Sequence, residues 1–199
     1  AEEPATGEIQ QEISAELAGA RKEVRAELAA ARIELQTGNL QVGNNMHFGK
    51  SGKRNAVRAS LPRAGITPRG DFLIGGKAVA IDPQQRQELL AYRGQVIDIA
   101  LAGIDIGERS AQAALDAVDR GLFSLMLAAM TGSLVRNLEE TLKASVGPGG
   151  RRLCHSLPPL LQSQQRLSAS VPQFRPYATL EKDDIEDCED EIRREFAQN

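Results

Sequence analysis

Apolar residues near the start of the chain recur at steps of three and four, and this pattern constrains the fold more than any other feature. Charged side chains fill the positions between them, and Gly38 follows the last of them. The spacing places the apolar residues on one face of an α-helix, and glycine commonly ends a helix. It therefore predicts an amphipathic helix over residues 8–36. A stripe this narrow suits docking within the chain, which we favour, or pairing with a partner. It consists of Ile13, Leu17, Ala20, Val24, Leu28, Ala31 and Leu35.

Few aromatic residues are available to a core. Aromatic side chains make up 4% of the 199 residues, and there is no tryptophan. Alanine and leucine should then build most of the core, and close packing of helices is the structure that such a composition favours. The length suits one domain, or one domain with an extension.

A basic segment without acids follows the first helix. Residues 38–63 contain several glycines and asparagines with little periodicity, and we predict a flexible loop with a short strand at Leu40–Val42. We interpret its charge as a solvated surface, and the alternative is a contact for anionic lipid or another polyanion. The net charge of −3 excludes a globally basic nucleic-acid binder. The bases between positions 44 and 70 are Lys50, Lys53, Arg54, Arg58, Arg63 and Arg69.

Residues 64–82 carry the turn residues of a β-hairpin. Pro68-Arg69-Gly70-Asp71 predicts one turn, and Gly75-Gly76 predicts a second turn between strands at 72–74 and 77–81. The first turn contains the tripeptide Arg-Gly-Asp, an integrin-type adhesion motif, but turn chemistry is sufficient to explain it.

A long helical stretch should follow from residue 82 to about Ser145. Asp82 and Gln85 predict a capping box at its start, with proline at the first helical position. A break near Gly121 or Gly132 would fold the stretch into a hairpin of helices.

The last fifty residues should form two more helices. Gly147-Pro148-Gly149-Gly150 should end the long stretch, and the next helix is expected over 151–170, interrupted at Pro158-Pro159. Pro172–Pro176 predicts a rigid connector before a final helix over 179–198, with acids near its start and arginines near its end.

These elements predict a mainly α fold, either a helical bundle or an extended helical hairpin, with one small β-hairpin. We expect three consecutive segments: an amphipathic helix over 1–37, a flexible basic loop over 38–63, and a main helical domain over 64–199.

Two cysteines, Cys154 and Cys188, fall on the last two predicted helices. If these helices run antiparallel, a disulfide can join them, which would indicate an oxidising compartment such as the periplasm. The alternative is a metal site that adds His155 to the two cysteines. It lacks a fourth ligand at a usable spacing, because the only other histidine is His47 in the basic loop. We favour the disulfide and predict no metal and no cofactor.

No motif predicts a specific catalytic chemistry. The chain has no nucleophile elbow, phosphate-binding loop or zinc-protease helix motif. Cys154 and His155 would point about 100° apart on a helix, too far to act as a nucleophile and its base. The eight acids between Glu181 and Glu191 lack the glycine and the ligand order of a calcium loop. We predict no catalytic residues. The alternative is an envelope hydrolase that uses carboxylates of this run or of the long helix.

The chain contains no stretch long enough to span a membrane. Its longest uncharged apolar run covers residues 121–135, 15 residues, where a helical span needs about 20. The first residues are Ala1-Glu2-Glu3-Pro4, without methionine, which suits a chain from which a signal peptide was removed or a trimmed chain.

Two parts of the chain carry a family resemblance. The hairpin and the helix start read Ile66-Thr67-Pro68-Arg69-Gly70-Asp71-Phe72-Leu73-Ile74-Gly75-Gly76-Lys77-Ala78-Val79, then Asp82-Pro83-Gln84-Gln85-Arg86-Gln87. Later segments read Pro172-Gln173-Phe174-Arg175-Pro176-Tyr177 and Asp183-Asp184-Ile185, followed by Cys188. Over about residues 64–188 the chain resembles the YggN-like family of exported proteobacterial proteins, which have no assigned function. The resemblance implies export to the envelope and pairing of Cys154 with Cys188, and it carries over no catalytic residue.

The sequence therefore predicts a non-enzymatic protein of the periplasm of a Gram-negative bacterium. Its expected partner is another envelope protein or an anionic membrane surface, reached through the N-terminal helix and the basic loop. We expect no nucleic-acid partner.

Overall fold

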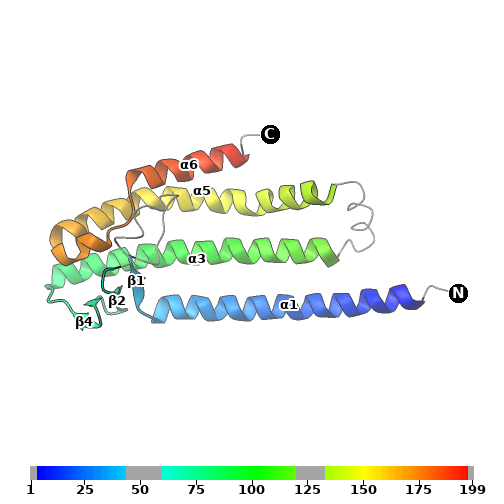
Figure 1. Ribbon diagram of the computed structural model, residues 1–199, viewed down its shortest axis with the longest axis horizontal. Helices are drawn as coiled ribbons and strands as arrows, with labels where there is room; N and C mark the ends of the chain where they lie inside the picture. The colour runs from blue at the N-terminus through cyan, green and yellow to red at the C-terminus, as the bar shows by residue number, and fades with distance from the viewer. Residues whose placement is uncertain (1–3, 44–59, 120–132, 197–199) are drawn as a thin grey trace. The chain divides into compact units, whose positions relative to one another are not determined.

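The structure is a computed structural model of residues 1–199, and it describes residues 4–43, 60–119 and 133–196. Within these ranges the fold is mainly α with a small antiparallel sheet, which confirms the predicted fold class (Figure 1). The helices are α1 (Pro4–Thr37), α3 (Pro83–Asp119), α5 (Ser133–Ser170), the 3-10 helix η2 (Pro172–Tyr177) and α6 (Lys182–Phe196).

The chain divides into two compact units, each built from separate stretches of sequence. The first unit contains Ala1–Arg32 and Gly103–Gly150, and the second contains Ile33–Ala102 and Arg151–Asn199. The long helices α1, α3 and α5 each contribute to both units. The division into consecutive segments 1–37, 38–63 and 64–199 stays a prediction.

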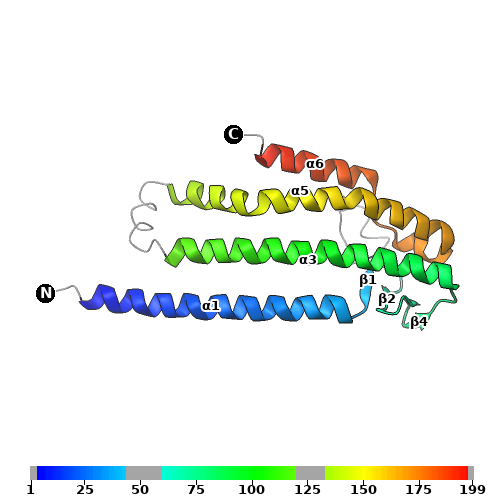
Figure 2. The ribbon, with the colours of Figure 1, turned by 180° about the vertical axis from the view of Figure 1, so that it is seen from behind.

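In the first unit, parts of α1, α3 and α5 lie side by side (Figure 2). The predicted N-terminal helix is confirmed and extends from Pro4 to Thr37. All seven residues of its apolar stripe are half-buried, while most of its charged side chains are exposed. The amphipathic pattern therefore gave the correct inward face.

Residues 147–150 do not end a helix, so this prediction was wrong. α5 runs without interruption through them. Gly147 and Gly150 are buried, and a Cβ added to Gly149 would lie 2.6 Å from Cγ1 of Ile106 on α3. Gly149 therefore allows a close approach between α5 and α3, and this packing outweighs its low helix propensity.

The predicted interruption at Pro158-Pro159 is also absent, because α5 continues to Ser170. Both prolines are exposed, while Leu157 and Leu160 on either side of them are buried. Burial of the flanking leucines holds the helix together although each proline lacks an N–H donor.

The core of the second unit contains more aromatic residues than the composition suggested. Phe72, Tyr92, Phe174 and Tyr177 are buried and meet edge to face, with ring centroids 5.3–6.2 Å apart. Leucines complete this core: Leu40, Leu89, Leu157, Leu160, Leu167 and Leu180.

A four-stranded antiparallel sheet lies in the second unit, in the order β1-β2-β3-β4. The strands are β1 (Leu40–Val42), β2 (Ala64–Ile66), β3 (Phe72–Ile74) and β4 (Lys77–Ala78). The hairpin at Gly75-Gly76 and the strand at 40–42 are both confirmed, and β1 pairs with β2 to make one sheet of them. The strand predicted over 77–81 is shorter.

The start of α3 is the predicted capping box. The backbone N–H of Gln85 donates to Oδ1 of Asp82 at 2.8 Å, and the Asp82 N–H donates to Oε1 of Gln85 at 2.8 Å. α3 and α5 are separate helices, as a break would require, but the expected break points at Gly121 and Gly132 lie outside the described residues.

Candidate interaction surfaces

The helix α1 is the first candidate surface because it lies at the margin of the packing. None of residues 7–37 is buried, and the first core residue of the chain is Leu40. Two large apolar side chains on α1 are exposed, Ile9 at 56% and Ile33 at 62%. Ile9 stands four residues before Ile13 and continues the half-buried stripe.

Ion pairs join α1 to α3 within the first unit. Nη2 of Arg21 lies 2.7 Å from Oδ1 of Asp116, and Nη2 of Arg32 lies 2.7 Å from Asp105 and 2.5 Å from Glu108. The hydrogen bond to Glu108, followed by the one to Asp105, raises the pKa of the Arg32 guanidinium. Partly exposed ion pairs contribute little stability each, so this contact is weaker than an apolar core of the same extent.

The end of α1 is held by a buried arginine of the second unit. Arg93 on α3 is 8% exposed, and its Nη2 donates to the carbonyls of Gln36 at 3.0 Å and Gly38 at 2.9 Å. The last carbonyls of a helix have no partner within the helix, and a cation there also interacts favourably with the helix dipole. Arg93 therefore fixes where α1 ends.

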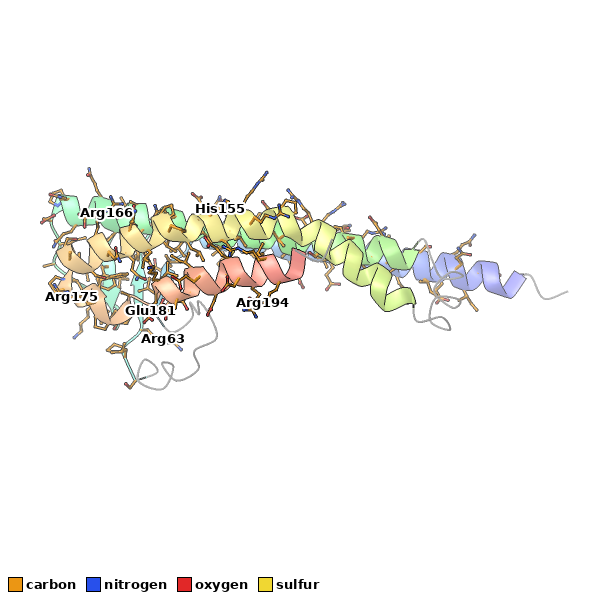
Figure 3. All side chains as sticks on the ribbon, turned by 90° about the horizontal axis from the view of Figure 1, so that it is seen from above. Arg63, His155, Arg166, Arg175, Glu181 and Arg194 are labelled. Atoms are coloured by element: carbon orange, nitrogen blue, oxygen red, sulfur yellow. A yellow bond between two sulfur atoms is a disulfide. The ribbon has the colours of Figure 1, made fainter. Side chains whose placement is uncertain are left out.

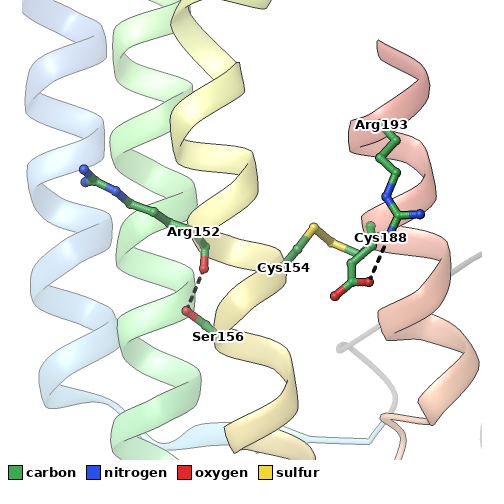
Figure 4. Close-up of a disulfide and its surroundings, with 6 residues drawn as sticks. Arg152, Cys154, Ser156, Cys188 and Arg193 are labelled. Carbon is green, nitrogen blue, oxygen red and sulfur yellow. Dashed lines mark hydrogen bonds and ion pairs between the residues drawn. A yellow bond between two sulfur atoms is a disulfide. The ribbon is translucent and has the colours of Figure 1, made fainter. Parts of the chain in front are cut away.

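A second fixed point is the disulfide between Cys154 on α5 and Cys188 on α6 (Figure 4). The Cα atoms are 5.8 Å apart, and Cys154 is 2% exposed while Cys188 is half-buried. No cysteine of the chain is free. The disulfide predicted from the sequence is thus present, and the two sulfur atoms are not available as metal ligands.

The side chain of Gln164 makes a further link between α5 and the segment that leads to α6. Its Nε2 donates to the carbonyl of Leu180 at 2.8 Å, and its Oε1 accepts from the Leu180 N–H at 3.0 Å. Gln164 and Leu180 are both buried. This contact resembles one rung of a β-ladder that is made by a side chain.

The acidic run from Glu181 to Glu191 lies on α6 and the residue before it. Oδ2 of Asp184 accepts from the N–H of Glu181 at 2.8 Å, which is a helix cap. Other acids form pairs along the helix, for example Glu189 with Arg193 at 3.6 Å. Asp183, Glu186, Asp187, Asp190 and Glu191 are exposed.

His155 is exposed on α5, whereas its neighbour Cys154 is buried, so the two side chains occupy different faces of the helix. In Figure 3, His155 and Glu181 lie apart on the second unit. Among the described residues, no group of three or more histidine, cysteine, aspartate or glutamate side chains could hold a metal ion.

The basic loop can be followed only in part. Lys50, Lys53, Arg54 and Arg58 lie outside the described residues, whereas Arg63 and Arg69 are described and exposed. Asp71, the last residue of the adhesion-type tripeptide, has a partner within the protein, because Nη1 of Arg86 donates to its Oδ1 at 2.6 Å. This hydrogen bond lowers the pKa of Asp71, and the turn prediction for this tripeptide is confirmed.

Sequence reasoning missed three residues that fix the second unit. Arg93 and Gln164 are polar residues inside predicted helices, and no periodicity identifies their backbone partners. The third is Tyr92, whose burial raises the pKa of its hydroxyl, and no described residue accepts a hydrogen bond from that hydroxyl. Only its placement near Leu89 on a helical stripe indicated burial.

In the described parts of the chain, no helix has both the length and the apolar character needed to cross a lipid bilayer. Comparison with models of protein families, with curated proteins and with solved structures finds no match. The resemblance to the YggN-like family therefore stays a prediction.

Proposed function

We propose that this chain is a non-enzymatic binding module of the periplasm of a Gram-negative bacterium, and that α1 is the element that contacts its protein partner. The observation that carries the proposal is the exposure of the side chains of α1. None of the described side chains from residue 7 to residue 37 is buried, yet an apolar stripe follows the whole helix.

The contacts of α1 support this role. A helix that served only to complete the core would bury its stripe, whereas the stripe of α1 is half-buried and Ile9 extends it with 56% of its surface exposed. Ion pairs from Arg21 and Arg32 hold α1 on α3, and such pairs can be exchanged for pairs with a partner at little cost. Helix-in-groove recognition uses apolar anchors at this spacing.

The disulfide supports the proposed compartment. Disulfides persist in oxidising compartments such as the periplasm and are rare in the cytosol of mesophiles. Cell fractionation followed by thiol labelling of the denatured protein tests this part. We expect the protein in the periplasmic fraction with neither Cys154 nor Cys188 labelled, and two labelled thiols there would contradict the proposal.

Affinity capture from the native periplasm tests the role of α1. The full-length protein is compared with the variant I9E, which places a charge on the exposed residue that continues the stripe. A26E serves as the matched control, because Ala26 is an exposed residue of the same helix that lies off the stripe. We expect a retained protein to be lost with I9E and kept with A26E. Equal capture by all variants would refute α1 as the docking element.

The alternative of an envelope hydrolase stays a prediction. It requires two carboxylates, or a carboxylate and a base, that face a common substrate. Asp184 caps α6, Glu189 pairs along the same helix, and His155 lies on α5 away from Glu181. No observation on the described residues favours this alternative over binding.

A further inference from the structure

One end of the second unit collects basic side chains from elements that are far apart in the sequence. The contacts that bring these elements together are well defined. Nε2 of Gln85, at the start of α3, donates to the carbonyl of Ser170, at the end of α5, at 2.7 Å. The hydroxyl of Tyr177, at the end of η2, donates to the carbonyl of Pro62 at 2.7 Å.

The turn before β3 belongs to the same end. Nη1 of Arg86 on α3 donates to the carbonyl of Arg69 in that turn at 3.0 Å. We call this end the basic tip and define it as residues 60–90 and 162–177. Figure 3 shows three of its bases, Arg63, Arg166 and Arg175, around this end of the unit.

The basic tip has an excess of positive charge. It contains six bases and three acids. The bases are Arg63, Arg69, Lys77, Arg86, Arg166 and Arg175, and the acids are Asp71, Asp82 and Glu88.

All three acids of the basic tip are already used within the protein. Asp71 pairs with Arg86, Asp82 caps α3, and Glu88 accepts a hydrogen bond from the hydroxyl of Ser170. By contrast, Arg63, Lys77, Arg166 and Arg175 form no ion pair with a described carboxylate. Arg69 acts on Asp71 only at longer range, where it helps to lower the pKa of that carboxyl, and all five bases are exposed. The positive charge of the tip is therefore presented to a partner.

From this juxtaposition we propose that the basic tip docks the protein on the surface of a bilayer that contains anionic phospholipid. Bases near such a surface are attracted by its negative potential, and the attraction is lost beyond a Debye length. This surface is separate from the protein-binding role of α1, so either can fail without the other.

Two features favour a lipid surface over a nucleic acid. Single-stranded nucleic acids stack their bases on exposed aromatic rings, but the aromatic residues of the tip, Phe72, Phe174 and Tyr177, are buried. The residues exposed beside the bases include apolar ones, Leu90 at 38% exposed, Pro62 and Pro68, together with uncharged glutamines such as Gln165 and Gln173. Apolar side chains beside bases suit the headgroup region of a bilayer.

The charges give the size of the expected effect. One base near an anionic surface strengthens binding about fivefold, so removal of three bases should weaken it by about 100-fold. The test variant is R63Q/R69Q/R166Q, in which the three side chains make no hydrogen bond or ion pair in the described structure. The matched control is R109Q/R152Q/R194Q, which removes the same charge from exposed positions outside the tip.

Vesicle sedimentation of the full-length protein tests the proposal. The probes are vesicles of phosphatidylcholine alone and vesicles in which phosphatidylglycerol replaces part of it. We expect binding to the anionic vesicles only, weakened by added salt, weakened about 100-fold in the tip variant and kept in the control. The charge-conserving variant R63K/R69K/R166K should bind like the parent, which separates loss of charge from loss of structure.

Three results would overturn the proposal. One is equal binding to both kinds of vesicle, or binding to neither. Another is equal weakening in the tip variant and the control variant, which would indicate net charge without a specific surface. The third is binding to a soluble polyanion such as double-stranded DNA, abolished in the tip variant, without binding to anionic vesicles.

Discussion

Removal of the disulfide should destabilise the protein by an amount that follows from its place in the chain. The two cysteines are 34 residues apart. In the chain-entropy model, closing a loop of this length contributes about 4 kcal/mol to the free energy of unfolding. The variant C154A/C188A keeps small apolar side chains at both positions and removes only the bond.

The structure also predicts which part of the molecule responds most. η2 lies inside the loop, but its Phe174 and Tyr177 belong to the core and should keep their place. Beyond Leu180, the described hydrophobic side chains that pack α6 against that core are the partly buried Ile185 and Cys188. Loss of the bond should therefore release α6 before it disturbs η2.

Urea unfolding followed by circular dichroism measures the global effect, and amide hydrogen exchange measures the local one. We expect a loss of about 2–4 kcal/mol and faster exchange in α6 than in η2. The parent protein in dithiothreitol should behave like C154A/C188A. The reasoning would be refuted by a variant within about 1 kcal/mol of the oxidised parent, with unchanged exchange in α6.

Three other changes test the second unit. Arg93→Met should lower the free energy of unfolding in urea by about 2–4 kcal/mol, because it leaves carbonyls at the end of α1 without donors. Arg93→Lys keeps a donor and should lower it by less. Gly70→Ala should cost about 2 kcal/mol more than Gly76→Ala in thermal unfolding. Both glycines have positive φ, but only at Gly70 would the new Cβ lie 2.8 Å from a side chain of α3. Arg86 lowers the pKa of the Asp71 carboxyl below its ordinary value of 3.8. The ionised carboxylate therefore stabilises the fold at pH values above 3.8, and this contribution is lost as the pH falls through the lowered pKa. Asp71→Asn should therefore lose less stability than the parent on acidification below that value, measured as unfolding midpoints.

The sequence correctly predicted those elements that are determined by residues close to one another in the chain. The period of the apolar residues identified α1 and its inward face, and the side chains of Asp82 and Gln85 marked the start of α3. These features are fixed within a few residues of chain, because helix periodicity and capping act over one or two turns.

The same signals were misleading where tertiary contacts outweigh local propensity. Gly149 lies in mid-helix because it packs on Ile106, which is 43 positions away in the sequence. Strand β1 was predicted, but its pairing with β2 depends on Leu40 meeting Ile66, and no local pattern encodes that register. The bond of Arg93 to the end of α1 is equally non-local.

The basic tip was predicted only in part for the same reason. The sequence showed the bases of residues 44–70 as one run, and Arg63 and Arg69 of that run do belong to the tip. Arg166 on α5 and Arg175 in η2 come from another part of the chain. They join the first two because Gln85 contacts Ser170 and Tyr177 contacts Pro62. The distribution of charge along the sequence identifies runs of bases, but it does not show which distant bases lie together on the folded surface.

The Gln164–Leu180 contact has a consequence for how the protein matures. From Gln164 back to Cys154 along α5 is about 15 Å. From Leu180 forward to Cys188 is at most about 16 Å, because two steps of non-helical chain precede six helical steps of α6. The segments 154–164 and 180–188 run antiparallel and have nearly equal lengths. The Gln164–Leu180 contact at one end of them therefore brings the two thiols opposite each other before they are oxidised. The local concentration of each thiol around the other then greatly exceeds that of thiols on neighbouring molecules. Oxidation of the two thiols should accordingly close the ring within one molecule instead of crosslinking two.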